Sequence, residues 1–283
     1  MPNTLAVWSL AAAAAAAMLV AAPSVPAQES AVSALDAAIA GAHRSERDRA
    51  RDRYRHPKET LEFFGFRPDM TVVEIWPASG WYTDILAPAL RRQGKLYLAQ
   101  YGDNPPFPYQ RREMEALAAK IDAAPEVYGE VEFTALDFDE RSKIAPDGSV
   151  DLVVTFRNVH NWFDPGYGPP NAAEIAFRKM YAALKPGGVL GVVDHRWPDP
   201  ETEDPQAANG YISEERVIRY AEAAGFEFAG RSDVNRNPRD THDHPNGVWT
   251  LPPDLAAPEE ERQRYLDIGE SDRFTLKFVK PAS

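Results

Sequence analysis

The sequence predicts a Rossmann-like α/β fold, with a mostly parallel seven-stranded sheet and helices on both faces. Short runs of β-branched and aromatic residues alternate with longer segments whose apolar residues recur at helical spacing. The chain has 283 residues, of which 44% are hydrophobic, and can therefore bury one large core. Turn sequences at residues 146–148 and 185–188 separate two of the expected strands from the segments before them.

The expected elements follow one another in a regular order. Strands are predicted at residues 71–76, 95–101, 131–136, 150–156, 189–194, 226–231 and 274–279. Helices are predicted at residues 58–64, 80–90, 107–123, 172–184 and 213–224, the last with Ser213 as its N-cap and Gly225 at its end. Strands separated by helices imply a parallel sheet. Ligands of such sheets bind beyond the carboxyl ends of the strands.

Residues 1–27 have the features of a secretory signal peptide. An apolar stretch runs from Leu5 to Ala22, and the small residues Val25 and Ala27 suit cleavage before Gln28. An uncleaved membrane anchor is the alternative, because the apolar run approaches spanning length. We therefore expect a periplasmic or secreted protein that has no membrane contact after cleavage.

The composition restricts the chemistry. The chain has no cysteine, which excludes disulfides, thiolate metal sites and a cysteine nucleophile. Its formal net charge of −12 disfavours binding to nucleic acid or to anionic membranes. A small-molecule substrate is the expected partner.

Two segments lie outside the regular alternation. Residues 28–64 are predicted to form a helical segment that packs on a domain of residues 65–283, and the alternating charges of residues 45–54 predict an exposed helix with ion pairs. Residues 232–265 are too long and polar for a plain connection, so they form either a lid or a flexible insertion. Within them, residues 242–244 (His-Asp-His) look like a metal clip but lack a distant third ligand, and no metal is predicted.

Several motifs fall where the expected strands end. The first strand leads from Glu74 into a tight turn of small residues that ends at Gly80, which allows a ligand to approach the backbone closely. Residues 137–138, Asp-Phe, follow the third strand, where a side chain and a backbone N–H can bracket a purine ring. The fourth strand runs into the polar and aromatic residues 157–162, and residues 184–188, Leu-Lys-Pro-Gly-Gly, introduce the fifth.

In this order the motifs resemble those of the class I S-adenosylmethionine (SAM)-dependent methyltransferases. The likeness covers about residues 45–195 and the closing strand, and it is most specific at residues 184–188. Residues 51–55, 74–83, 157–162 and 271–278 further resemble a family of bacterial predicted methyltransferases that are often exported. The resemblance implies the class I methyltransferase type of fold, SAM as cofactor, and methyl transfer to a small or medium-sized substrate.

The resemblance also implies a set of cofactor contacts. Glu74, Ser79 and Gly80 would contact the methionine end, Gln100 and Tyr101 the ribose, and Asp137 and Phe138 the adenine. Trp76, Ala78 and Arg157 complete the predicted cofactor-binding set.

The chain departs from the family pattern at three of these positions. Trp76 and Ala78 stand where glycines are usual, and Gln100 stands where an acid usually holds the ribose hydroxyls. An amide binds a diol less strongly than a carboxylate does. The alternative function is therefore a non-catalytic protein of the same fold that binds another metabolite in the periplasm.

Methyl transfer depends chiefly on alignment, with a base only where the nucleophile carries a proton. His160 is the predicted base, because imidazole titrates near neutrality and the residue follows the fourth strand, although a structural role in the loop is the alternative. His195 is the reserve base, and Asn158 is expected to orient the substrate. Trp81 or Trp162 would supply an aromatic wall for a cationic centre.

Overall fold

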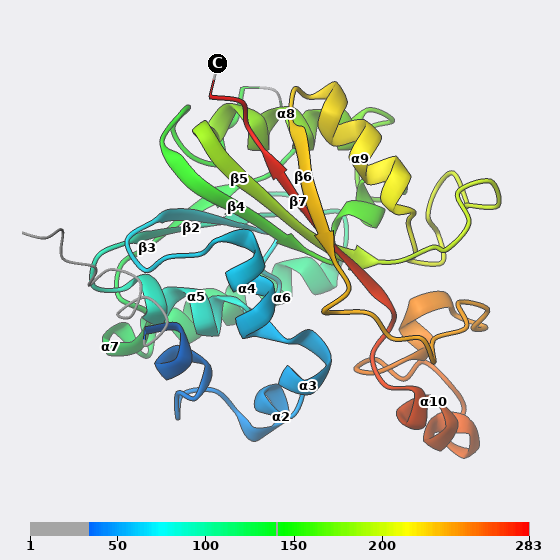
Figure 1. The fold of residues 1–283 in the computed structure, drawn as a ribbon. Coiled ribbons are helices and arrows are strands. Elements are labelled where there is room, and N and C mark those ends of the chain that lie inside the picture. The colour runs from blue at the N-terminus through cyan, green and yellow to red at the C-terminus, as the bar shows by residue number, and fades with distance from the viewer. Residues whose placement is uncertain (1–33, 140, 283) are drawn as a thin grey trace, which may run out of the picture.

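The computed structural model describes residues 34–139 and 141–282, so the predicted signal peptide lies outside the described residues. Seven strands of this part of the chain form one sheet in the order β3-β2-β1-β4-β5-β7-β6 (Figure 1). They are β1 (Thr71–Ile75), β2 (Lys95–Gln100), β3 (Val131–Ala135), β4 (Val150–Phe156), β5 (Leu184–His195), β6 (Glu227–Ser232) and β7 (Arg273–Val279). Strands β1 to β5 pair in parallel, and β7 is antiparallel to both of its neighbours. The predicted fold class is confirmed.

The five helices predicted from residue 58 onward are confirmed. Residues 34–39 are helical, followed by α2 (Glu46–Arg49), α3 (Asp52–Arg55), α4 (Pro57–Phe64), α5 (Thr83–Leu90), α6 (Pro108–Asp122), α7 (Pro125–Tyr128), α8 (Ala172–Ala183), α9 (Glu214–Ala223) and α10 (Arg262–Ile268). Three 3-10 helices are η1 (Val159–Phe163), η2 (Gly247–Thr250) and η3 (Glu259–Glu261). Helices α7 and α10 and these 3-10 helices of the described residues were not predicted. None of the helices described is both long and apolar enough to cross a membrane.

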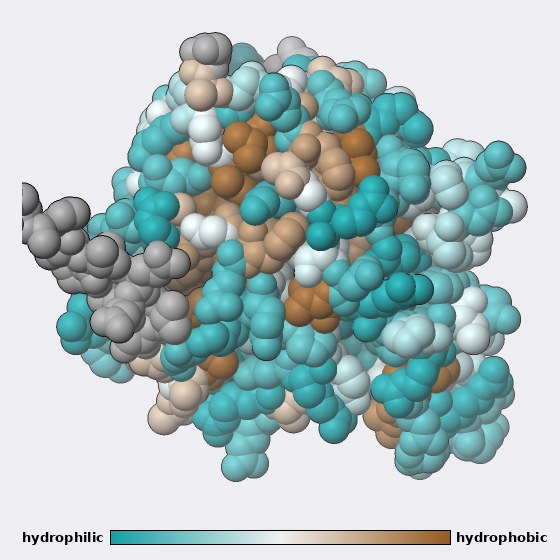
Figure 2. Space-filling view, in the orientation of Figure 1, coloured by the Kyte–Doolittle hydropathy of each residue, from teal (hydrophilic) through white to brown (hydrophobic). Residues whose placement is uncertain are grey.

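Alternate residues of the central strands face opposite sides of the sheet, as the two-residue period of a strand requires. Val72 packs in one apolar cluster with Leu86 of α5, and Val73 packs in another with Phe177 of α8. In Figure 1, α8 and α9 accordingly cover one face, and α4, α5 and α6 the other. The view in Figure 2 is mostly hydrophilic, in keeping with the many charged residues of the chain.

The fifth strand begins earlier than predicted. Leu184 pairs with Val150 and Val189 with Leu152, so the intervening residues 185–188 bulge out of the ladder and do not precede it. The bulge stays within the strand because Gly187 N–H donates to Lys280 C=O at 2.8 Å, beyond the end of β7.

The prediction that residues 45–54 form a single helix is wrong, although these residues are exposed or half-buried as expected. The segment forms two short helices, α2 and α3, and the flanking Arg44 and Arg55 are each only 1% exposed. Arg44 forms an ion pair with Asp52, and Arg55 forms one with Glu270 from the other end of the chain. Burial is possible because each guanidinium group has a carboxylate partner.

Candidate functional site

A cleft of about 520 Å³ lies at the carboxyl ends of β1, β4 and β5. Strands β1 and β4 are neighbours in the sheet. From β1 the strand order continues in one direction, to β2 and β3, and from β4 in the other, to β5, so the cleft lies at the topological switch point. The predicted site residues that line it are Glu74, Trp76, Ala78, Ser79, Tyr101, Arg157, Asn158, His160 and His195. Those that do not line it are Gly80, Gln100, Asp137 and Phe138.

The turn after β1 keeps an unusual backbone. Trp76, Ala78 and Gly80 all have positive φ, of 43°, 52° and 82°. This left-handed region suits glycine, and it strains residues that carry a Cβ atom. These are the positions at which the resembling family carries glycine. The turn therefore has the backbone of a glycine-rich loop, although two of its three left-handed positions carry a side chain.

Glu74 points from β1 toward the start of α5. Its carboxyl group is buried, and Oε2 accepts a hydrogen bond from Thr83 Oγ1 at 2.6 Å. Burial raises the pKa of Glu74 to about 8, although the bond from Thr83 opposes this rise. Glu74 therefore holds its proton at neutral pH and adds no charge to the cleft.

The indole of Trp76 fills the space between the residues predicted to contact ribose and adenine. Its Nε1 donates to the C=O of Leu136, just after β3, at 2.9 Å. The ring centroid lies 4.9 Å from that of Tyr101 and 6.1 Å from that of Phe138. Only 4% of Trp76 is exposed.

The remaining predicted nucleoside contacts have different surroundings. Asp137 accepts hydrogen bonds from Ser142 and, at 3.4 Å, from Lys179, so it supports the loop after β3. Gln100 is buried at the end of β2, and neither its side-chain nitrogen nor its oxygen has a partner among the described residues. Unpaired buried amide groups are costly, and Gln100 therefore marks a place where a polar ligand group would be stabilised.

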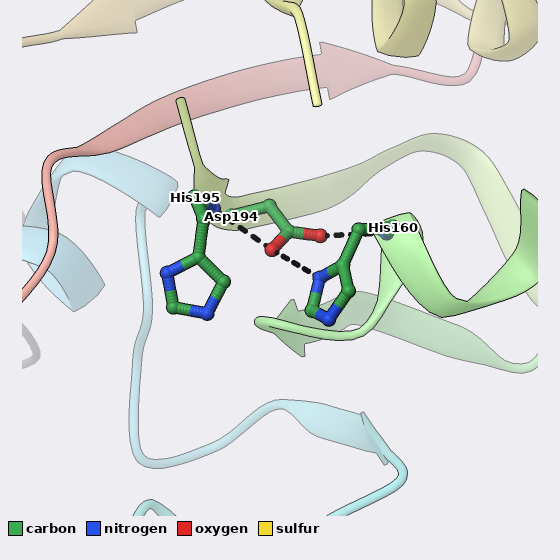
Figure 3. Close-up of side chains that lie close together, drawn as sticks. All are labelled: His160, Asp194 and His195. Atoms are coloured by element: carbon green, nitrogen blue, oxygen red, sulfur yellow. Dashed lines mark hydrogen bonds and ion pairs between the residues drawn. The ribbon is translucent and has the colours of Figure 1, made fainter. Parts of the chain in front are cut away.

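His160 is held by Asp194 at the end of β5 (Figure 3). Asp194 accepts from the backbone N–H of His160 at 3.0 Å, from its Nδ1 at 2.8 Å, and from the backbone N–H of His195 at 2.8 Å. Nδ1 of His160 is therefore the donor, and Nε2 remains as the basic nitrogen. An oriented imidazole with a free Nε2 at the wall of a cleft is suited to general-base chemistry.

His195 is the second imidazole of this wall. Its Nδ1 lies 2.5 Å from Ser271 Oγ, and its ring centroid is 5.3 Å from that of His160. Burial, followed by the charges of His160 and Arg157, lowers the pKa of His195 well below its usual value, so it is neutral at pH 7. In Figure 3 the Nε2 atoms of both rings point to the same side, away from the Asp194 carboxylate.

These three residues are close enough together to suggest a metal site, since their ligand atoms lie within 4.8 Å of one another. However, the oxygens of Asp194 already accept three N–H groups. Two imidazoles alone remain, fewer than the three protein ligands of a typical catalytic zinc site. The arrangement fits an Asp-oriented histidine base better than a metal centre.

Comparison with known proteins identifies the fold. No protein-family model and no curated protein matches the chain. Among solved structures, a SAM-dependent methyltransferase from Aquifex aeolicus aligns with a TM-score of 0.52 at 17% identity, covering 82% of this chain and 93% of that one. A SAM-dependent methyltransferase from Methanosarcina mazei aligns with a TM-score of 0.50 at 13% identity, covering 79% and 97%. The chain has the class I methyltransferase fold.

A third similar structure limits what this methyltransferase fold implies. The cyclase SpnF aligns with a TM-score of 0.54 at 18% identity, covering 90% of this chain and 94% of that one. Since a protein described as a cyclase shares the methyltransferase fold, the fold alone does not determine the reaction. The site residues must carry the functional argument.

The long segment at residues 232–265 contributes to the cleft of this methyltransferase fold. Val248 and Trp249 of η2 and residues 252–254 line it, and the Trp249 ring lies 6.4 Å from that of His160. The segment therefore forms part of the wall opposite the sheet ends.

The side chains of residues 242–244 have separate contacts. His244 Nε2 contacts Asp240 at 2.8 Å, whereas His242 Nε2 lies 3.6 Å from Asp272. Asp243 accepts from Thr241 at the surface. The three side chains do not converge on one point, because each has a separate partner that holds the loop in place.

Asn158 and the tryptophans also have structural contacts within the methyltransferase fold. Asn158 Nδ2 donates to the C=O of Ile75 at 2.8 Å, which ties the end of β4 to that of β1. Trp162 is 1% exposed and belongs to the core, so it forms no wall of the cleft. Trp81 does line the cleft, but Arg44 and Arg55 lie over its ring at 4.9 and 4.6 Å.

Four residues that shape the site were not among the predicted site residues, namely Arg51, Asp194, Glu270 and Ser271. Asp194 had a detectable signal, because it precedes His195 at the end of a buried strand, where an acid needs a partner. The other three come from segments before β1 and just before β7, and Arg51 and Ser271 lie within the family-like ranges 51–55 and 271–278. Only the folded chain brings them to the cleft.

Proposed function

We propose that the protein is a SAM-dependent methyltransferase that acts on a small or medium-sized substrate. The observation that carries the proposal is the position of the cleft, which opens at the switch point of a methyltransferase fold beside the turn that follows Glu74. SAM-dependent methyltransferases are among the solved structures that share this fold. When bound, SAM supplies an electrophilic methyl group.

One part of the cleft and one buried residue support this cofactor. Ala78 and Ser79 are small residues on the cleft wall, where the amino-acid end of SAM would lie. Gln100 does not line the cleft, but it precedes the cleft-lining Tyr101, and its unpaired amide offers both a donor and an acceptor at the position expected for the ribose hydroxyls. A diol satisfies both groups at once.

The adenine position does not fit SAM while Trp76 lies where it does. The indole occupies the space beside Tyr101 and Phe138, and it is held there by its bond to Leu136. The proposal therefore includes a movement of the Trp76 side chain before the cofactor enters. Exposing a large apolar side chain costs about 3 kcal/mol, so the cofactor should bind about 100-fold more weakly than it would to an open site.

His160 is the proposed general base. Asp194 holds Nδ1, so Nε2 is the atom that accepts a proton from the substrate nucleophile. Asp194 acts as a positioning residue, because it fixes both the ring and the position of its N–H.

The second candidate function is a non-catalytic protein of this fold that binds another metabolite. The packing of the Trp76 indole favours this candidate, because the indole lies among aromatic rings like a core residue. The same packing hinders the binding of SAM. In this case the indole would stay in place whatever ligand the cleft binds.

Calorimetric titration with S-adenosylhomocysteine separates the two candidates. Trp76→Gly removes the indole from a position whose φ suits glycine, and it should bind with a Kd in the micromolar range, about −8 kcal/mol, while the native protein binds about 100-fold more weakly. The control Trp197→Gly removes an indole outside this region and should leave the affinity unchanged. Absence of binding to a folded Trp76→Gly protein, checked by circular dichroism, would favour the second candidate.

We also propose that the protein is exported and acts on a small molecule in the periplasm or outside the cell. The proposal rests on the predicted signal peptide and on the net charge of −12, which disfavours nucleic acid. N-terminal sequencing of protein from the periplasmic fraction of its host should find Gln28 as the first residue. An intact Met1 on protein from the membrane fraction would indicate an anchor.

A further inference from the structure

Glu270 lies at the centre of a group of arginines. Its Oε1 accepts from Arg51 Nε at 2.6 Å, and its Oε2 accepts from Arg55 Nε at 3.0 Å and from Arg273 Nη1 at 2.9 Å. Its side chain is only 3% exposed. Burial raises the pKa of this carboxyl, but the surrounding guanidinium groups outweigh that effect and hold the pKa well below its usual range. One ionised carboxylate therefore serves three arginines.

Arg157 adds a fourth guanidinium group. It follows β4 on the cleft wall, and within the described residues its side chain has neither a hydrogen bond nor an ion pair. Its charge interacts with Glu270, Arg51 and Arg273. A half-buried arginine without a partner is costly, because its desolvation is not compensated.

The remaining carboxyl groups do not balance these charges. Asp254 and Glu113 also line the cleft and interact with Arg157, but burial raises the pKa of both and so favours their neutral forms. Even with both ionised, four arginines face three carboxylates at this end of the cleft. Arginine stays protonated at neutral pH, so the excess of positive charge persists.

Unused hydrogen-bond donors accompany the excess charge. The buried nitrogen atoms without a partner include Nη2 of Arg51 and both Nη atoms of Arg55, which is 1% exposed. Burial, followed by the charge of Arg157, lowers the pKa of Arg55, and the attraction of an anion bound nearby would offset both effects. Paired N–H groups of arginine match the oxygens of a carboxylate or phosphate.

We propose that the arginine cluster formed by Arg51, Arg55, Arg157 and Arg273 binds an acidic group of the substrate, a carboxylate or a phosphate, with Arg157 and Arg51 in direct contact. The inference rests on the proposed function, since it assigns the substrate class of the same cleft. The charge of SAM does not suit it as the anion that the arginine cluster binds. Its carboxylate is accompanied by an ammonium and a sulfonium group, so it carries a net positive charge and would add to the excess.

The position of the cluster relates the acidic group to the base. Ser271, next to Glu270, hydrogen-bonds His195 Nδ1, and His195 lies beside His160. The two histidines, Glu270, Ser271, Arg51 and Arg157 line the same cleft, whereas Arg55 and Arg273 of the arginine cluster do not. A substrate held by its acidic group at Arg157 therefore presents its nearby atoms to the Nε2 of His160.

Inorganic phosphate is the probe for the test, titrated by calorimetry at low ionic strength, where screening is weak. We expect the native protein to bind phosphate, Arg157→Gln and Arg51→Gln to weaken binding at least tenfold, and the exposed-surface control Arg111→Gln to leave it unchanged. Arg157→Gln breaks no hydrogen bond of the described structure, so it should fold normally. Absence of phosphate binding, or equal binding by Arg157→Gln and the native protein, would overturn the proposal.

A second titration with S-adenosylhomocysteine, in the Trp76→Gly background, separates an acidic substrate from the carboxylate of the cofactor. We expect phosphate not to compete with it, and Arg157→Gln not to weaken it. Competition together with weakening would assign the cluster to the cofactor and overturn the proposal. If phosphate binds while S-adenosylhomocysteine does not, the anion site stands and the proposed methyltransferase function fails.

Discussion

The two sides of the cleft differ in how far their polar groups are satisfied. On the β1 and β2 side, the Trp76 indole packs against Tyr101 and donates to a backbone carbonyl, which closes the region with apolar contacts. On the β4 and β5 side, Arg157 and the Nε2 of His160 have no partner among the described residues. Gln100 at the end of β2 is an exception on the closed side, since its buried amide has no partner among the described residues. The open side has charged and basic groups that need a ligand. The comparison teaches that the open side offers charged and basic groups to a ligand, whereas the Trp76 indole has to move before a ligand can occupy the closed side.

Removing the carboxylate at the centre of the arginine cluster should have the largest effect on stability. Glu270→Gln leaves four guanidinium groups without their main counter-charge and should lower the free energy of unfolding by about 3–5 kcal/mol. Urea unfolding measures this loss, with the exposed Glu130→Gln as the matched control. If 10 mM phosphate restores part of the loss in Glu270→Gln, the open side is indeed limited by unpaired positive charge. A loss below about 1 kcal/mol would show that the cluster is less buried than the structure indicates.

The next largest expected effect is a pH dependence of stability that comes from Glu74 on the closed side. The pKa of Glu74 is raised to about 8 in the folded protein, so the folded state favours the neutral carboxyl. The contribution of the neutral Glu74 carboxyl to the stability of the folded state is fully present below the unfolded pKa of about 4.5. It is lost as the pH rises toward 8. Glu74→Gln keeps an acceptor for Thr83 and cannot ionise. The native protein should therefore lose a few kcal/mol relative to this variant between pH 4.5 and 8, as measured by urea unfolding at several pH values.

A difference between the two proteins that stays constant across this range would contradict the assignment of Glu74 as neutral at pH 7. In that case Glu74 would be ionised at neutral pH, with its charge balanced by Lys120. The closed side would then carry a charge, and its contrast with the open side would be smaller.

The smallest effect tests how His195 is held. Ser271→Ala removes the hydroxyl that lies 2.5 Å from Nδ1 of a buried imidazole, which should cost about 1 kcal/mol of stability. The His195 ring, once released, should also show altered NMR signals, while His160 keeps its bond to Asp194. Unchanged stability and unchanged His195 signals would mean that Ser271 does not fix the ring.

The sequence was sufficient for the fold because the fold depends on local patterns. The apolar strands, the capping residue Ser213 and the glycines after the helices are all readable within short windows, and Ser213 does accept the expected hydrogen bond from Arg216 N–H. Most of the predicted cleft residues follow β1 or β4, since strand ends in parallel sheets meet at one edge.

The rest of the site was not readable because it depends on contacts between distant segments. The alternating charges of residues 45–54 are typical of one exposed helix, yet the segment forms two helices, and the adjoining Arg55 is buried with a bond to Glu270, 215 positions further on. The direction of the Trp76 side chain also depends on a backbone conformation that tryptophan rarely adopts. Neither property follows from residue type or spacing.

The left-handed turn after β1 has an evolutionary consequence. Its backbone at Trp76 already has the φ that glycine adopts freely, so replacing the indole with hydrogen requires no rebuilding of the loop. The tryptophan codon differs from one glycine codon by a single base. A single base change can therefore add or remove the indole at this turn without rebuilding its backbone.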